Sequence, residues 1–145
     1  MRKLIPIFVF AVVLNLASCT SITVTPPDAS LSMKHVCIEI NPKVEVSDFV
    51  SVVQDGFQRH GISSSVYSPP KPADCEYILT YTARRSWDIV PYLSVAEIKI
   101  EKDGRQVAFA EYHLVGKGGF SLMKYQGTKA KMDPVIDELL KNQPL

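Results

Sequence analysis

The sequence predicts an α+β fold: a two-layer sandwich in which two helices cover one face of a mixed, mostly antiparallel sheet, in the order β-α-β-β-β-β-α. Two segments, residues 47–60 and 128–140, carry apolar residues at helical spacing. The segments between them alternate apolar and polar residues with the period of a strand. A helix between the first two strands favours a right-handed crossover and a parallel pair, whereas hairpin-length loops predict that the later strands are antiparallel.

The folded domain is expected to begin near His35 with a strand, a helix and a second strand. Residues 35–40 alternate in hydropathy, and the Asn-Pro pair that follows them ends the strand. Ser47 is the expected N-cap of an amphipathic helix of about 13 residues, and Gly61 is a natural stop after it. The segment 62–67 is expected to form a short strand.

The second half of the domain is expected to contain three longer strands. Residues 75–84 are the strongest strand in the chain, because β-branched and aromatic residues fill it. Residues 92–101 and 106–115 are expected to form a hairpin, since its turn, Asp103-Gly104, tolerates the positive φ of a type I′ turn. Phe120–Met123 is expected to resume the last strand after a glycine-rich break.

The C-terminal segment is expected to be a helix with one buried face. Its apolar residues follow the helical spacing and are Met132, Val135, Ile136, Leu139 and Leu140. The helix could start with Asp133 as its cap and Pro134 in the first turn, or at Thr128 with a bend at Pro134. The start at Thr128 is favoured, because it keeps the apolar residues before Pro134 on the helix.

Length and composition limit the classes of function. The chain has 145 residues, 46% hydrophobic and 21% charged, which fits one globular domain and is too apolar for a disordered protein. A formal net charge of +1 argues against a nucleic-acid binder that depends on bulk charge. Three cysteines are too few for a disulfide-dense miniprotein or for a zinc site with four cysteine ligands.

The N-terminus has the order of a secretory leader. Arg2 and Lys3 precede an apolar run of about 11 residues, too short to span a bilayer. The next residues, Leu16-Ala17-Ser18-Cys19, resemble a bacterial lipobox. This resemblance implies cleavage after Ser18, so that residues 1–18 are a signal peptide, and lipidation of Cys19. The alternatives are an ordinary secretory peptide with a chance cysteine, or an uncleaved N-terminal anchor.

The same segment predicts where the protein works. Two or more lipid signals on one residue give stable anchoring without a transmembrane helix. Thr20 follows the cysteine, and by the sorting rule of enteric bacteria this resembles an outer-membrane address. Residues 19–34 are expected to be the lipidated N-terminus and a flexible tether, with 35–145 as a single periplasmic domain. The alternative is that Ile22 and Val24 add a strand to the fold.

Two parts of the chain carry a resemblance to a known family: Cys75–Asp88 with Tyr92–Ile98, and Phe120–Tyr125 with Lys131–Leu139. On these residues, most of the predicted mature chain resembles a small family of uncharacterised proteobacterial lipoproteins. The resemblance implies an outer-membrane lipoprotein and brings no activity to transfer. The strand order also resembles small α+β domains of other outer-membrane-associated lipoproteins and of envelope assembly factors, a likeness of fold that does not imply function.

The cysteines and histidines were considered as sites. With Cys19 lipidated, Cys37 and Cys75 remain as an even pair in an oxidising compartment, which predicts a disulfide; the alternative is two buried free thiols. The histidines do not have the spacing of a zinc site, so no metal and no cofactor are expected. No catalytic residue is assigned.

The cluster Arg84, Arg85, Trp87 and Asp88 is the candidate partner-binding site. Two guanidinium groups beside an indole on the loop 84–91 could recognise a carboxylate, a phosphate or a partner strand. The alternative is structural: Trp87 covers the edge of the core and Asp88 pairs locally.

These observations favour a non-enzymatic, outer-membrane-anchored lipoprotein that serves as a binding or accessory module of the cell envelope. Its expected partners are the membrane, through Cys19, and an envelope protein, with no nucleic acid. One alternative is a binder of a small or lipidic ligand between sheet and helices. A less favoured one is a small envelope hydrolase that uses Asp88 or His113.

Overall fold

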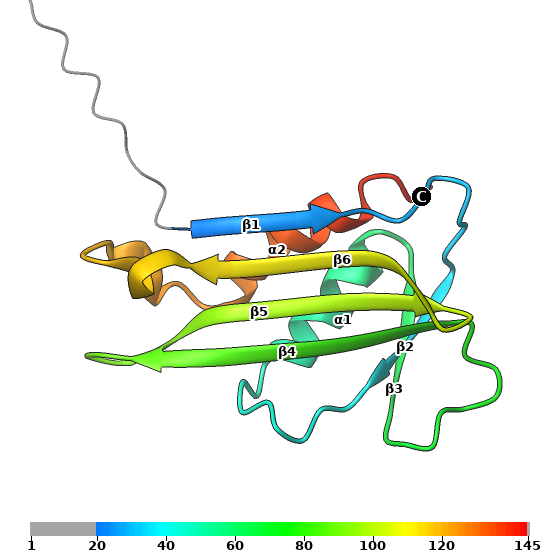
Figure 1. Ribbon diagram of the computed structural model, residues 1–145, viewed down its shortest axis with the longest axis horizontal. Helices are drawn as coiled ribbons and strands as arrows, with labels where there is room; N and C mark the ends of the chain where they lie inside the picture. Colours follow the sequence, from blue (N-terminus) through cyan, green and yellow to red (C-terminus); the bar gives the residue numbers. More distant parts are fainter. Residues whose placement is uncertain (1–19, 145) are drawn as a thin grey trace, which may run out of the picture.

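The computed structural model describes residues 20–144, so the predicted signal peptide and Cys19 lie outside the described residues. Six strands form one sheet, in the order β1-β6-β5-β4-β2-β3, and both α-helices cover the same face of it (Figure 1). The strands are β1 (Thr20–Thr25), β2 (His35–Glu39), β3 (Ser63–Tyr67), β4 (Tyr77–Trp87), β5 (Pro91–Lys102) and β6 (Arg105–Leu114). The helices are α1 (Phe49–Arg59) and α2 (Thr128–Leu140), with short 3₁₀ turns η1 (Val115–Gly118) and η2 (Leu122–Tyr125).

The predicted fold class is confirmed: the sheet is mixed and open, and the fold is α+β. β2 and β3 are parallel and joined through α1, as the crossover rule predicts. One expectation was wrong, because β3 and β4 do not pair with each other. Both flank β2 in parallel, so the segment 68–76 crosses over β2 instead of forming a hairpin.

The tether expected at residues 19–34 is corrected in its first part. Residues 20–25 form β1, an edge strand antiparallel to β6, in register from Thr20 opposite Leu114 to Thr25 opposite Phe109. The physical reason is local: Ile22 and Val24 alternate with threonines, and β-branched residues suit a half-buried strand. The domain therefore begins at Thr20, not near His35.

Several element boundaries also differ from expectation. β4 continues to Trp87 and β5 begins at Pro91, so Arg84 and Arg85 lie in a strand and the loop is only Asp88–Val90. Phe120–Met123 does not resume a strand, because glycines with positive φ turn the chain away from the sheet before it.

Two predicted details are confirmed. The β5–β6 turn has positive φ at both central residues, 51° at Asp103 and 73° at Gly104, as a type I′ turn requires. The helix α2 starts at Thr128 and contains Pro134.

The core fills the space between the sheet and the helices with apolar side chains from every layer. Phe49 of α1 stacks on Tyr81 of β4, with ring centroids 5.3 Å apart. The two helices approach closely at Gly56, where an added Cβ would lie 2.7 Å from Cγ2 of Ile136. A side chain at this position would therefore separate the helices or displace a fully buried isoleucine.

The predicted disulfide is present between Cys37 and Cys75, whose Cα atoms are 5.9 Å apart. Val36 and Ile38, on either side of Cys37 in β2, point into the core beneath the helices. Since neighbouring side chains in a strand alternate, Cys37 points to the other face of the sheet. The bond therefore fastens the crossing segment 68–76 over the face that the helices leave open.

Candidate functional site

Two loops lie together at one end of the sheet, which we call the loop end. They are the β4–β5 connection, Asp88–Val90, and the segment between β6 and α2, residues 115–127. The sheet register places both at the same end as the start of β1, because Thr20 lies opposite Leu114, directly before the second loop. Figure 1 shows this end on the left, with the Asp103–Gly104 turn at the opposite end, which we call the turn end.

The loop end exposes most of the large apolar side chains that the described residues leave in solvent. Trp87 is 71% exposed and Phe120 is fully exposed. Elsewhere in residues 20–144, the only other exposed large apolar side chains are Ile22 and Val66. We call the following set the apolar platform: Trp87, Ile89, Val90, Val115, Phe120, Leu122 and Met123.

A charged network holds the two loops to each other. Asp88, at the tip of the β4–β5 connection, accepts hydrogen bonds from the Lys124 ammonium and the Tyr125 hydroxyl, both in η2. It also accepts one from the backbone N–H of Ile89. Hydrogen bonding, first from Lys124 and then from Tyr125, lowers the pKa of Asp88 to about 2. The carboxylate is therefore charged across the physiological pH range and is already engaged.

Lys124 completes the connection from the side of the second loop. Its ammonium also donates to the Gly119 carbonyl at 3.0 Å and lies 5.5 Å from the centre of the Tyr92 ring. The hydrogen bond with Asp88 raises the pKa of Lys124. Gly118 allows this packing: its φ is +79°, and a Cβ there would lie 2.8 Å from the Lys124 Cβ. The Lys124 ammonium is thus covered and bonded on both sides, to Asp88 and to Gly119.

A second lysine is buried just below the loops. Lys131 of α2 is 5% exposed and has no acidic partner within ion-pair distance among residues 20–144. Its ammonium donates to the carbonyls of Leu93 and Lys124 and lies between the rings of Tyr92 and Tyr112, 5.6 and 5.9 Å from their centres. Burial lowers the pKa of Lys131 to about 8. The cation joins α2, β5 and η2 beneath the platform.

The two arginines of the predicted cluster point in different directions. Arg85 lies 3.6 Å from Asp48, which in turn accepts a hydrogen bond from the Thr128 hydroxyl at 2.9 Å, so this arginine braces the starts of both helices. Arg84 is exposed, lies opposite Val95, and has no ion-pair partner among the described residues. Their divergence follows from strand geometry, in which successive side chains take opposite faces.

Arg84 shares a shallow hollow with His113, and Arg85 also contributes to its lining. Val95 lies between them in register, opposite Arg84 on one side and His113 on the other. The hollow has a volume of about 310 Å³ and is directly behind the loop end. A cationic side chain with free donors at this place can bind a phosphate or carboxylate from solvent.

The sequence prediction therefore found part of the site. Trp87 and Asp88 are both exposed, but only Asp88 lies in the loop, because Trp87 is the last residue of β4. The local pairing of Asp88 is the alternative that the sequence left open for it. The prediction missed the contribution of the 115–127 segment, which supplies Phe120 and Lys124. The sequence did hold a signal for this segment. Three large apolar residues fall within four positions after a glycine-rich break, and such residues are unusual in a loop.

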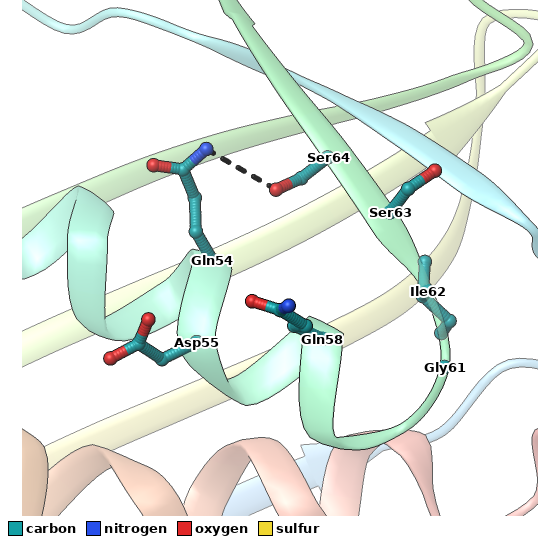
Figure 2. Close-up of a pocket in the computed structure, with 7 residues that line it drawn as sticks. All are labelled: Gln54, Asp55, Gln58, Gly61, Ile62, Ser63 and Ser64. Atoms are coloured by element: carbon teal, nitrogen blue, oxygen red, sulfur yellow. Dashed lines mark hydrogen bonds between the residues drawn. The ribbon is translucent and has the colours of Figure 1, made fainter.

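A separate polar hollow lies beside the edge strand β3, between it and α1 (Figure 2). It has a volume of about 590 Å³, and Gln54, Gln58 and Ser64 are among its lining residues. Gln54 donates a hydrogen bond to the Ser64 hydroxyl at 3.3 Å across the hollow. Asp55 also lines the hollow, so amide, hydroxyl and carboxylate groups together can bind a polar partner there.

The remaining candidate residues have structural partners. His35 contacts the hydroxyls of Ser63 and Ser65 at 2.7 and 2.9 Å, and His60 contacts Asp137 at 2.8 Å across the helix pair. No helix in residues 20–144 is long and apolar enough to cross a membrane.

Comparison with known proteins gives a likeness of fold. No protein-family model matches the sequence, and no curated protein matches it. Among solved structures, the chain is similar to a PelC dodecamer from Paraburkholderia phytofirmans, with a TM-score of 0.54 and 16% identity over 85% of this chain and 96% of that chain. A dodecamer of a leucine-to-methionine variant of that PelC gives a TM-score of 0.55 and 17% identity over 84% and 96%. At these identities the likeness concerns the fold alone.

Proposed function

We propose that this protein is an outer-membrane-anchored lipoprotein, held by acyl chains on Cys19, whose domain is a non-enzymatic binding or accessory module of the cell envelope. The observation that carries the proposal is the order of charge, apolar run and lipobox directly before β1. The disulfide supports an oxidising compartment, because such bonds persist mainly outside the cytosol.

The non-enzymatic part of the proposal is supported by how the charged groups at the loop end are used. Asp88 is engaged by Lys124 and Tyr125, and Lys131 donates to backbone carbonyls. These contacts hold loops and helices together. A general acid or base must form a hydrogen bond with its substrate, whereas these groups form their hydrogen bonds within the protein.

Metabolic labelling with a fatty acid tests the anchor. The full chain is expressed in a bacterial host beside Cys19→Ala, with Ser21→Ala as a matched control in the neighbouring strand. We expect the parent and the control to take up label and to fractionate with the outer membrane. We expect Cys19→Ala to lose the label and to be released or to remain as unprocessed precursor. Equal labelling of all three chains contradicts the proposal.

We also propose that copies of the chain assemble side by side. The specific observation is that the similar solved structures are dodecamers, while in this chain β1 and β3 are the two edges of an open sheet. Edge strands carry unpaired backbone groups and invite pairing with another chain. Val66 is exposed on β3, so Val66→Lys is expected to lower the mass measured by light scattering, whereas Thr82→Lys on the open face is expected to leave it unchanged.

A further inference from the structure

The geometry points to the apolar platform as a membrane-docking surface, which enters the interfacial layer of the same bilayer that holds the Cys19 acyl chains. This inference rests on the proposed function, because it takes its bilayer from the lipid anchor. It goes further by assigning the loop end a ligand, the lipid surface, and the domain an orientation.

The platform lies close to the proposed lipid anchor. Cys19 directly precedes Thr20, so their Cα atoms are about 3.8 Å apart. Thr20 is already in β1 and lies opposite Leu114, the last residue before the second loop of the platform. Thr20, the residue that follows the proposed lipidation site, therefore lies beside the start of the second loop, and residues 20–25 form a strand and not a linker.

The side chains of the platform are of the kinds that enter a membrane interface. The platform combines an indole, a phenyl ring and branched aliphatic side chains, all exposed and all at one end. Both loops line one hollow of about 480 Å³, to which Ile89 and Phe120 both contribute, so the two sets of side chains form one surface. Exposed contiguous apolar surface marks an interaction site, and tryptophan in particular prefers the interface between membrane and water.

The charges of the two loops also favour contact with a bilayer. Across residues 87–91 and 115–127 the only acidic residue is Asp88, and it is neutralised by Lys124. A free carboxylate would oppose contact with a bilayer, and the loops present none. Arg84, three residues before Trp87 in β4, is exposed and has no ion-pair partner among the described residues. With the platform in the bilayer, Arg84 would lie at the level of the lipid phosphates, which a guanidinium group binds well.

The surface of the platform is also preformed. Asp88 joins the β4–β5 connection to η2, and Lys131 joins η2 to β5 and α2. These bonds join both loops to the sheet and to α2, while the apolar side chains of the platform remain exposed. A platform held in this way meets the bilayer without first ordering its loops, which lowers the entropic cost of docking.

The fluorescence of Trp87 tests the inference directly, because it is the only tryptophan in the sequence. The lipidated full chain is reconstituted into vesicles of phosphatidylethanolamine and phosphatidylglycerol, with and without brominated acyl chains. We expect bromine near the headgroup end of the chains to quench Trp87, and acrylamide quenching to be several-fold weaker than for the same residue in the urea-unfolded chain.

Matched variants separate docking from anchoring. Phe120→Asp with Leu122→Asp, at two exposed positions, is expected to remove quenching by bromine while the chain stays lipidated and keeps its disulfide. A reporter moved to the turn end, Trp87→Phe with Gln106→Trp at an exposed position, is expected to remain open to acrylamide and unquenched by bromine.

Each other outcome overturns the inference in a distinguishable way. A lipidated chain whose Trp87 is open to acrylamide and unquenched by bromine has its platform in water, and the proposed function then stands without it. A Trp87 that is shielded from acrylamide but not quenched by bromine is covered by protein. Mass spectrometry that finds no acyl group on Cys19 overturns the inference together with the proposed anchor.

Discussion

The loop end and the turn end of the sheet distribute the same kinds of residue in opposite ways. At the turn end, charged side chains face solvent and pair there: Lys102 lies 2.6 Å from Glu76 and 5.0 Å from the centre of the Tyr77 ring. A disulfide fastens the nearby crossing segment. At the loop end, the cations Lys124 and Lys131 are covered, and tryptophan and phenylalanine are outside.

The difference shows that stability in water explains one end and not the other. Surface ion pairs and a covalent bond are ordinary means of stabilising a small domain. Exposed aromatic residues above a buried, unpaired cation do not improve stability in water. The proposed contact with a bilayer would account for the residues of the loop end, and the following predictions test the contrast between the two ends from its largest effect to its smallest.

The largest effect is expected from the disulfide. Cys37→Ser with Cys75→Ser opens a loop of sequence separation 38, for which the loop-entropy relation gives a loss of roughly 3–4 kcal/mol in the free energy of unfolding. Urea unfolding measures it. The parent chain with reductant is the control and is expected to match the double variant. A loss below about 1 kcal/mol would show that the turn end does not depend on this bond.

The contact between the two helices gives a reference value for the effect of a core substitution on stability. Gly56→Ala is expected to lower the free energy of unfolding by about 1–3 kcal/mol, because its Cβ meets the buried Ile136. Gly127→Ala, where a Cβ meets open space, is expected to change it by less than about 1 kcal/mol, because the weaker N-cap and the less flexible unfolded chain act in opposite directions. Thermal unfolding of both decides the matter, and a stabilised Gly56→Ala would mean that the helices move apart freely.

The buried cation of the loop end is expected to make stability depend on pH. Burial lowers the pKa of Lys131 from 10.5 to about 8, so above pH 8 the folded chain binds fewer protons than the unfolded one. Deprotonation then favours folding, and the free energy of unfolding is expected to rise by about 1–2 kcal/mol between pH 8 and pH 10. The rise is complete only above the unfolded pKa.

Lys131→Met is the control for this rise. The variant keeps an unbranched side chain at the site and has no proton to lose, so its free energy of unfolding is expected not to rise over the same range. Tyr67 and Tyr125, whose pKa values are raised on folding, are expected to lower it slightly as the pH approaches 10. Urea titrations at each pH compare the two chains. Parallel curves would show that another group causes the dependence.

The smallest effect is expected from the platform itself. Phe120→Ser removes a fully exposed side chain and is expected to change the free energy of unfolding by less than about 0.5 kcal/mol. Phe57→Ser, at a fully buried phenylalanine, is expected to lose far more. Comparable losses in the two variants would place Phe120 in the core and remove the contrast between the ends.

Much of the fold could be predicted from the sequence because periodicity is local. The α1 segment, the Asp103–Gly104 turn and the Thr128 start of α2 each depend on neighbours within a few residues. β1 could not be placed with the same security. Its partner, β6, lies more than 80 residues away, and six residues rich in threonine and serine fit a strand or a spacer equally well.

The candidate site was predicted in part for a related reason. Trp87 and Asp88 are close in sequence and were recognised together. Lys124 and Tyr125 reach Asp88 from 36 and 37 positions along the chain, and only the path of the intervening strands brings them there. Arg84 and Arg85 are adjacent, yet the strand that carries them turns one to each face.

The pairing of β1 with β6 also sets an order of events. Thr20 cannot meet Leu114 until almost the whole chain is present, so in a chain delivered N-terminus first the opening strand waits extended while the rest arrives. β1 can join the sheet only once β6 is in place, so the edge formed by the first strand of the sheet is expected to be among the last parts of the fold to close.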